Sequence, residues 1–392
     1  MKVSTTNAPA AELEAEALIL AIPEDTGKPT SWDAVDAIVG GIVSEALAGP
    51  VFQGKRGQTL ALSTPGNHCR ELVLVGLGMS EELDLEVWRR AVANAISKAR
   101  QRGSSKIAVP LPEIDGHDSA DLAIAATEAA ILTSYRYREF KAAPAEFVEL
   151  EEILLAAPVD IASATIRAQK IADATCWARD LINTPSNMKR PDSLAAHARE
   201  MAVETGLEFE IIESEEAQQL GLNALLAVGQ GSAVGPRLVI LEHRPIGATG
   251  QPTVLVGKGI TFDTGGISLK PAQKMGDMKA DMSGAAAVFG TMRALAELDA
   301  QSWVVGVTPL AENMPSSQAY RPSDIIRAYD GTTIEVLNTD AEGRVVLADA
   351  LAYACKRYDP CRIVDLATLT GACVVALGSY AAGLMGNDDE LC

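Results

Sequence analysis

Residues 338–344 (NTDAEGR) form a polar cluster between the apolar run 332–337 and the apolar helical run 345–354. Two carboxylates, Asp340 and Glu342, lie two residues apart, where we expect a strand to end. A buried carboxylate without compensation is so costly that it is usually paired or bound to metal. In open α/β sheets, ligands bind beyond the carboxyl ends of strands. The cluster therefore predicts such a sheet, with a site at its edge.

The remaining chain alternates short apolar runs with runs of helical spacing. Strands are predicted at 17–23, 71–78, 105–111, 208–212, 238–242, 253–257, 303–310 and 362–366, and helices at 87–101, 161–182, 193–205, 284–298 and 345–358. Strands alternating with helices favour parallel sheets covered by helices. We predict two α/β domains, at 1–155 and 185–392, joined by a linker helix within 156–184. The sheet of the second domain is expected to be mixed, mostly parallel and flanked by helices.

Charge and cysteine usage exclude several classes of protein. The 392-residue chain carries a net charge of -19, which repels phosphate backbones and anionic lipid, so a nucleic acid partner is not expected. No apolar run approaches the roughly 20 residues that span a bilayer, so no membrane partner is expected. The six cysteines form no CxxC pair, which favours reduced, mostly buried thiols and a cytoplasmic protein.

A second cluster follows the apolar run 253–257, which leads into Lys258 and Asp263. Nearby glycines let the backbone take a positive φ and approach a ligand closely; they stand at 257, 259, 265 and 266. Asp281 comes just before the predicted helix 284–298, whose partly positive start favours a carboxylate. With the first cluster, four carboxylates then lie at three separate strand-to-loop junctions.

Four carboxylates can converge only if cations compensate them. Hard oxygen ligands suit Mg²⁺, Mn²⁺ or Zn²⁺, and several together can bridge two ions. The histidines lie outside both clusters, at 68, 117, 197 and 243, which argues against a histidine-ligated zinc site. The sequence therefore predicts a dinuclear metal site at strand ends, suited to hydrolysis, where Lys270 and Arg344 could stabilise charge on the reacting oxygen.

These residues also have plain structural interpretations. The two carboxylates of the first cluster could cap the helix at 345–358, since acidic residues favour a first turn. Lys258 and Lys270 could be solvated cations, and Arg344 could serve only as an ion-pair partner of Glu342. The presence of both clusters in one chain favours the metal site.

Four stretches resemble the leucine aminopeptidase family, also called cytosol aminopeptidases. They are VGKGITFDTGGISLKP at 256–271, MKADMSGAAAV at 278–288, NTDAEGRVVLADAL at 338–351 and DLATLTGA at 365–372. The heptapeptide with its upstream partner is specific, and the resemblance covers most of the second half of the chain. It implies a metal-dependent aminopeptidase that hydrolyses the N-terminal peptide bond of peptides, at leucyl and other residues, with two metal ions.

The resemblance implies metal ligands residue by residue. The tighter-bound ion would be held by Lys258, Asp263, Asp281 and Glu342, and the more exchangeable ion by Asp263, Asp340 and Glu342. Asp263 and Glu342 would then bridge two ions, Mn²⁺ or Zn²⁺. Lys258 must be neutral to offer a lone pair, and neighbouring cations favour this by depressing its pKa.

Catalytic and substrate-binding residues are implied in the same way. Lys270 would polarise the substrate carbonyl, and Arg344 would hold a bicarbonate that serves as general base. The ions would also anchor the free amino group of the substrate. Positions around the substrate pocket match Met278, Thr368, Leu369 and Gly371, although Met278 alone would suit a core and the other three an ordinary strand end.

The sequence departs from the family at two places. Thr264 stands where Ser is frequent, which keeps the hydroxyl, and the chain ends at Cys392 where family members continue, so we expect the C-terminal part of the catalytic domain to be missing. The family also implies a homo-hexamer. Two alternatives stay open, another carboxylate-metal hydrolase and a DNA-binding or regulatory protein that uses the N-terminal domain. The acidic charge disfavours the second.

Overall fold

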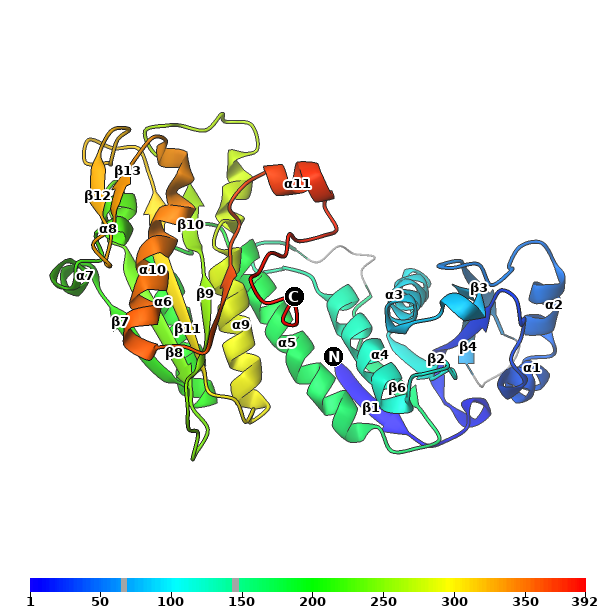
Figure 1. Ribbon diagram of the computed structural model, residues 1–392. Helices are drawn as coiled ribbons and strands as arrows, with labels where there is room; N and C mark the ends of the chain where they lie inside the picture. Colours follow the sequence, from blue (N-terminus) through cyan, green and yellow to red (C-terminus); the bar gives the residue numbers. More distant parts are fainter. Residues whose placement is uncertain (65–68, 143–147) are drawn as a thin grey trace. The chain divides into compact units, whose positions relative to one another are not determined.

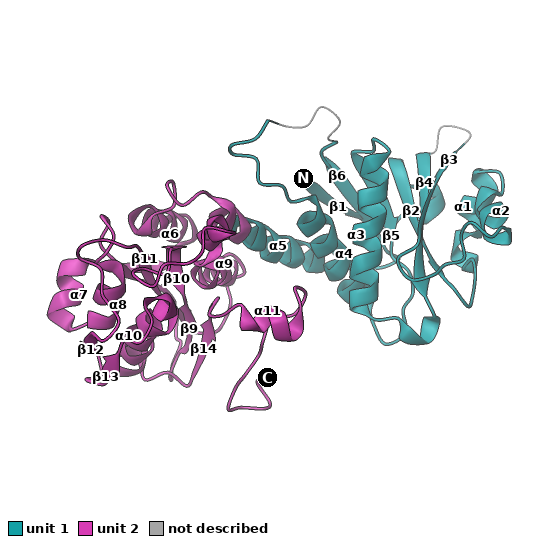
Figure 2. Ribbon diagram, turned by 90° about the horizontal axis from the view of Figure 1, so that it is seen from above, with its two compact units in different colours: residues 1–177 teal, residues 178–392 magenta. Residues whose placement is uncertain are grey.

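A computed structural model of the chain describes residues 1–64, 69–142 and 148–392 (Figure 1). It divides into two compact units, Met1–Trp177 and Ala178–Cys392 (Figure 2). The border falls inside helix α5 (Ala162–Asn183), the helix that we expect to act as a linker. The domain limits at 155 and 185 stay predictions. His68 lies outside the described residues.

The first unit is built on a six-stranded sheet of order β1-β6-β5-β2-β4-β3, in which only β3 and β4 pair antiparallel. Its strands are β1 (Lys2–Thr6), β2 (Ala15–Pro23), β3 (Thr59–Ser63), β4 (Cys69–Gly78), β5 (Lys106–Pro110) and β6 (Glu152–Ala156). Its helices before α5 are α1 (Asp33–Ile38), α2 (Ile42–Ala48), α3 (Leu85–Gln101) and α4 (Ser119–Ser134), with 3₁₀ turns η1 (Ala10–Glu12), η2 (Thr30–Trp32) and η3 (Ser80–Glu82).

The apolar residues of β2 serve both faces of this sheet. Ile19 and its alternate neighbours join one hydrophobic cluster with α3 and α4, whereas Leu18 and Leu20 join another with α1 and α2. Successive side chains of a strand point to opposite faces, so a continuous apolar run fits a strand that is covered on both sides. The predicted α/β architecture of this unit is confirmed.

The second unit has a mixed sheet of order β14-β9-β11-β8-β7, with β10 also paired to β11. Its strands are β7 (Glu208–Ile212), β8 (Arg237–His243), β9 (Thr253–Gly257), β10 (Gly259–Asp263), β11 (Val304–Asn313) and β14 (Arg362–Leu366). The helices are α6 (Pro191–Thr205), α7 (Ser214–Leu220), α8 (Asn223–Gly229), α9 (Ser283–Glu297), α10 (Glu342–Tyr358) and α11 (Ala372–Leu377). β14, β9, β10 and β11 pair in parallel, whereas β8 is antiparallel to both of its neighbours, β11 and β7, as predicted for a mixed, mostly parallel sheet.

Two expectations need correction. A strand does end just before the cluster 338–344, as expected, but it is β13 (Thr333–Glu335), which pairs with β12 (Ile325–Arg327) in a separate hairpin and is not part of the main sheet. The cluster 338–344 instead forms the 3₁₀ turn η5 (Thr339–Ala341) and the start of α10. The expectation of mostly buried cysteine thiols is wrong, because only Cys69 is buried.

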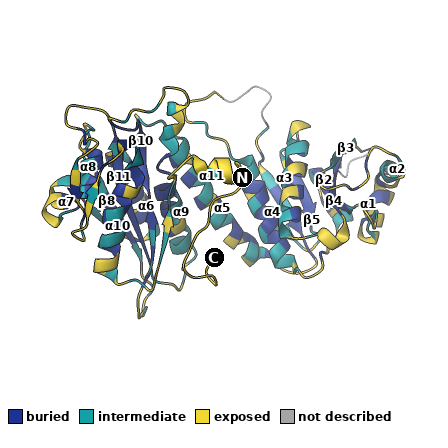
Figure 3. Ribbon diagram, turned by 45° about the horizontal axis from the view of Figure 1, so that its top comes forward, coloured by how far each residue is buried: buried dark blue, intermediate teal, exposed yellow. Residues whose placement is uncertain are grey.

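The buried residues are concentrated in the sheets and on the helix faces that cover them (Figure 3). Strands β9, β10 and β11 are mostly buried, whereas α11 and the residues after it are exposed. Among the described residues, we find no helix with the length and apolar character needed to cross a membrane.

Lys189 has a fully buried amine in the turn between α5 and α6. Its Nζ donates to the carbonyl oxygens of Ile182, at 3.0 Å, and Lys279, at 2.9 Å. This ties the C-terminal turn of α5 to the 3₁₀ turn η4 (Met275–Ala280). Burial, with a smaller contribution from the charge of Lys279, lowers the pKa of Lys189 to about 7.

We expect this buried amine to make stability depend on pH. Between about pH 7 and pH 10.5 the unfolded chain keeps a proton that folded Lys189 has released, so the free energy of unfolding rises with pH in this window. Lys189→Met removes the titration. The difference in unfolding free energy, wild type minus Lys189→Met, should rise by up to about 1.4 kcal/mol per pH unit, measured by urea denaturation. Lys55→Met, at an exposed position, controls for the lost charge. A difference that does not change with pH would contradict the interpretation.

Candidate metal centre

Neighbouring parallel strands carry polar residues to one edge of the second sheet. β9 and β10 follow one another along β11, with Lys258 between them and Asp263 at the end of β10. β11 ends at Asn313, and Thr368 lies two residues beyond β14. Because the carboxyl ends of parallel strands meet at the same edge, these four side chains are brought into one region.

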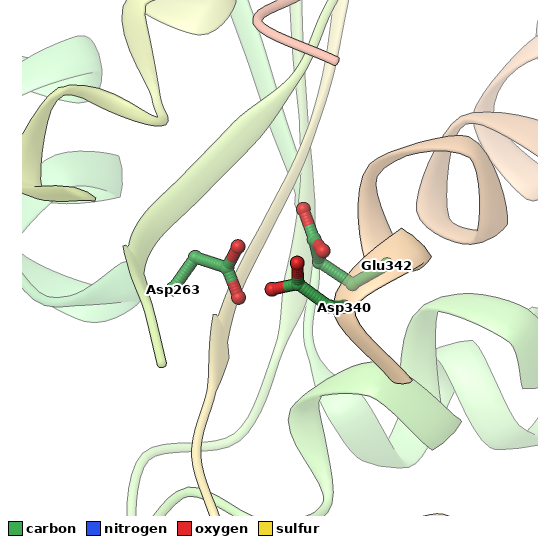
Figure 4. Close-up of side chains that lie close together, drawn as sticks. All are labelled: Asp263, Asp340 and Glu342. Atoms are coloured by element: carbon green, nitrogen blue, oxygen red, sulfur yellow. The ribbon is translucent and has the colours of Figure 1, made fainter. Parts of the chain in front are cut away.

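Three carboxylates converge at this edge (Figure 4). Asp263 comes from the end of β10, Asp340 from η5 and Glu342 from the first residue of α10. Each offers one oxygen, and these oxygens all lie within 4.8 Å of one another. Asp263 and Glu342 are each only 2% exposed. Three hard oxygen ligands at this spacing form a set that could hold a divalent cation.

Lys258 joins a fourth carboxylate to this group. Its Nζ lies 2.8 Å from both carboxylate oxygens of Asp281, 2.8 Å from Glu342 Oε1 and 2.7 Å from the carbonyl oxygen of Thr368. Burial lowers the pKa of Lys258, but the carboxylates of Asp281 and Glu342 outweigh it, so the net pKa is raised. The Thr368 hydroxyl donates to Asp281 Oδ1 at 2.7 Å.

Gly343 makes the position of Lys258 possible. A Cβ atom at 343 would lie 2.7 Å from Lys258 Cε and 2.8 Å from Nζ. A side chain on this turn of α10 would therefore displace the buried ammonium group.

Lys270 occupies the other side of the cluster. Its Nζ lies 2.9 Å from Asp263 Oδ2 and also contacts the carboxylate of Asp340. These two carboxylates raise the pKa of Lys270 against the opposing effect of burial, so the side chain is cationic. The backbone reaches this position through a turn in which Gly265 and Gly266 have φ of +87° and +65°.

The cluster holds more negative charge than its lysines neutralise. Four carboxylates face two ammonium groups, and Glu342 Oε2 is buried without a hydrogen-bond partner among the described residues. Burial, followed by the charges of Asp263 and Asp281, raises the pKa of Glu342 to about 7. Both features fit a site that binds additional cations.

The remaining predicted site residues differ in exposure and in their contacts with the carboxylate cluster. Met278 lies in η4 and accepts the N–H of Asp281 at 3.2 Å through its carbonyl oxygen. Leu369 is 48% exposed, and Gly371 is exposed at the start of α11. Arg344 is also exposed. Within the described parts of the chain these last three make no contact with the carboxylates that is comparable to that of Thr368.

Several plain interpretations are wrong. Lys258 is buried rather than solvated, and Lys270 is held in ion pairs rather than free in a loop. Arg344 forms no ion pair with Glu342 in the residues that the structure describes, because Glu342 pairs with Lys258. Of the four glycines expected to take a positive φ, those at 257 and 259 instead lie in strands.

Sequence reasoning missed three buried polar residues behind the carboxylates. Asn313, Thr339 and Tyr320 are at most 2% exposed, and all three hydrogen bond within this region. An amide that follows the long apolar run of β11 is the one signal that could have indicated Asn313. Thr339 lies within the cluster 338–344, but it is uncharged, so the charge pattern does not identify it.

Comparison with known families gives two matches. The family model described as "Cytosol aminopeptidase family, catalytic domain" matches residues 176–392, and "Cytosol aminopeptidase family, N-terminal domain" matches residues 19–144. The two matched segments together cover most of the chain.

Individual proteins similar to this chain point to the same family. The cytosol aminopeptidase of Pseudomonas aeruginosa is 42% identical over 389 residues, which are 97% of this chain and 78% of that protein. Among solved structures, the bottromycin maturation enzyme BotP in complex with Mn is 36% identical, with a TM-score of 0.79, over 93% of this chain and 74% of BotP. A mutant form of tomato leucine aminopeptidase is 30% identical, with a TM-score of 0.85, over 96% of this chain and 75% of its own.

If Asp263 bridges two ions, its loss should remove more than one ligand bond. We expect wild-type protein dialysed against Mn²⁺ to hold two ions per chain, and Asp263→Ala to hold one at most. Elemental analysis gives the stoichiometry, and Asp277→Ala, an exposed carboxylate on η4, is the matched control. Two ions in Asp263→Ala would rule out the bridge.

Proposed function

We propose that two metal ions are held by the carboxylate cluster at the carboxyl edge of the second sheet. The proposal starts from the family: the chain belongs to the cytosol aminopeptidase family and is a metal-dependent aminopeptidase. The ligands in this proposal are Lys258, Asp263, Asp281, Asp340 and Glu342. The single observation that carries it is the convergence of Asp263, Asp340 and Glu342, with their oxygens within 4.8 Å of one another.

The division of ligands follows from the two groups of contacts. Asp281 and Glu342 meet at Lys258, which supports one ion there, shared with Asp263; the family resemblance is the reason for proposing that this ion is the tighter-bound one. Asp263 and Asp340 meet at Lys270, which supports a second, more exchangeable ion. Lys258 would have to release its proton to offer a nitrogen lone pair, which neighbouring cations favour.

When bound, two divalent ions activate a shared water and polarise a carbonyl. The residues of the chain supply the remaining parts. Lys270, a cation beside Asp263 and Asp340, is placed to stabilise negative charge on the carbonyl oxygen of the substrate. Arg344 is exposed at the start of α10 and forms no ion pair with the residues that the structure describes, and we propose that it holds the bicarbonate that serves as general base.

The substrate would enter from the side of Thr368. The hydroxyl of Thr368 contacts Asp281 and its carbonyl oxygen contacts Lys258. The next residue, Leu369, has an exposed apolar side chain. Together with Met278 and Gly371, these residues are proposed to line the pocket for the N-terminal side chain of a peptide. Mn²⁺ or Zn²⁺ are the proposed ions, and the Mn-bound BotP supports the first.

The proposal predicts an exopeptidase that depends on metal and on a free amino group. We expect Leu-amide to be hydrolysed with added Mn²⁺, hydrolysis to be lost in EDTA, and activity to return with excess Mn²⁺. N-acetyl-Leu-amide should not be cleaved, because acetylation removes the amine that the ions bind. Ammonia release measures both, with the Pseudomonas aeruginosa enzyme as a positive control. Equal hydrolysis of the two amides would contradict exopeptidase action.

We also propose a homo-hexamer in the cytoplasm, from family membership. Static light scattering of the purified chain should then give a particle six times the mass of one chain. A particle of one or two chains would contradict the hexamer for this sequence, without bearing on the metal site.

A further inference from the structure

Asn313 is a fully buried amide directly behind the carboxylate cluster. Its Nδ2 donates to Asp263 Oδ1 at 2.8 Å and to the carbonyl oxygen of Thr339 at 3.0 Å. Asp263 and Thr339 belong to segments far apart in the sequence, and Thr339 immediately precedes Asp340. One amide group thus holds together the two loops from which Asp263 and Asp340 extend.

The orientation of this amide is fixed by chemistry. A half-turn would place Asn313 Oδ1 against the carboxylate of Asp263 and the carbonyl of Thr339, both of which are acceptors. In the observed orientation Oδ1 is buried without a hydrogen-bond partner among the described residues, which destabilises the folded chain. The amide group therefore holds the two segments through its two N–H donors, while its oxygen stays without a hydrogen bond among the described residues.

Thr339 completes the connection, because every polar atom it has is used. Its N–H donates to Ser268 Oγ at 3.2 Å, and its hydroxyl donates to the carbonyl of Gly265 at 2.6 Å and accepts from the N–H of Ser268 at 2.8 Å. Its carbonyl accepts from Asn313 and from the hydroxyl of Tyr320, at 2.7 Å. The loop that carries Lys270 is thereby attached to the residue beside Asp340.

We propose that Asn313 and Tyr320 are positioning residues, which act through the carbonyl of Thr339 to fix the separation of Asp263 and Asp340 and so set the affinity of the more exchangeable ion. This inference rests on the proposed metal site. Asp263 would also serve the tighter-bound ion, but neither residue hydrogen bonds to Lys258 or Asp281 in the described structure, so two of the ligands of that ion are held independently of them and its affinity should change less. Replacing a residue that orients a metal ligand in this way commonly lowers the affinity for the metal by about ten- to a hundredfold.

The test is stepwise Mn²⁺ binding to the full chain by isothermal titration calorimetry. Asn313→Leu removes both donors while keeping the number and branching of the side-chain heavy atoms, and Tyr320→Phe removes one hydroxyl with little change in shape. Thr308→Val is the matched control, since Thr308 is also fully buried on β11 and donates only to the carbonyl of Val239, at 3.4 Å. We expect the Kd of the weaker ion to rise about tenfold or more in Asn313→Leu and a few-fold in Tyr320→Phe, and neither Kd to change in Thr308→Val.

Activity supplies a second readout that a purely structural role would not give. If the catalytic groups are intact, excess Mn²⁺ should restore Leu-amide hydrolysis in Asn313→Leu towards the wild-type rate. Circular dichroism checks folding, and if Asn313→Leu does not fold, Tyr320→Phe decides.

Three outcomes would overturn the inference. Unchanged affinity for the weaker ion in the folded variants contradicts it directly. Equal loss in Thr308→Val shows that any damage to β11 has the same effect. Wild-type protein that binds fewer than two ions removes the proposed metal site itself, whereas two ions in wild type and unchanged variants leave that site standing and contradict only the positioning role.

Discussion

The mutual repulsion of four carboxylates at one largely buried edge governs the second unit. Lys258 and Lys270 each stand between two of them, so that neither side of the cluster is left without a cation. Pairs of this kind are not a general source of stability, because desolvating the charges offsets much of the attraction. Their presence near the carboxyl ends of β9 and β10 is what the proposed metal site requires.

Local patterns were enough to predict most of the fold that supports this edge. The apolar run 253–257 became β9, and the Ala-rich segment before Leu298 became α9, since buried parallel strands and long apolar helices both leave continuous signals. The sequence does not indicate β10, because the glycines around it favour an irregular backbone over a strand. α4 was not predicted either, because a helix that is apolar on nearly all sides has no helical period to detect.

The site shows the same division between local and long-range information. Charged residues in the two clusters could be found because charge between apolar runs is unusual, and a family resemblance gave them roles. Asn313 and Tyr320 could not be found in this way, since each is a neutral residue whose importance comes from its contact with Thr339. That contact joins segments separated by 26 and 19 residues along the chain, which no local pattern reports.

The absence of a side chain at Gly343 has an evolutionary consequence. A methyl group there would lie 2.7 Å from Lys258 Cε, so a side chain at 343 and the observed position of Lys258 compete for the same space. A larger residue at 343 requires the end of the Lys258 side chain to move away from Asp281 and Glu342, whereas a shorter residue at 258 leaves room for it. The two sites, 85 positions apart in numbering, are therefore expected to evolve as a pair. A lineage that abandoned the buried amine would be free to reshape the first turn of α10.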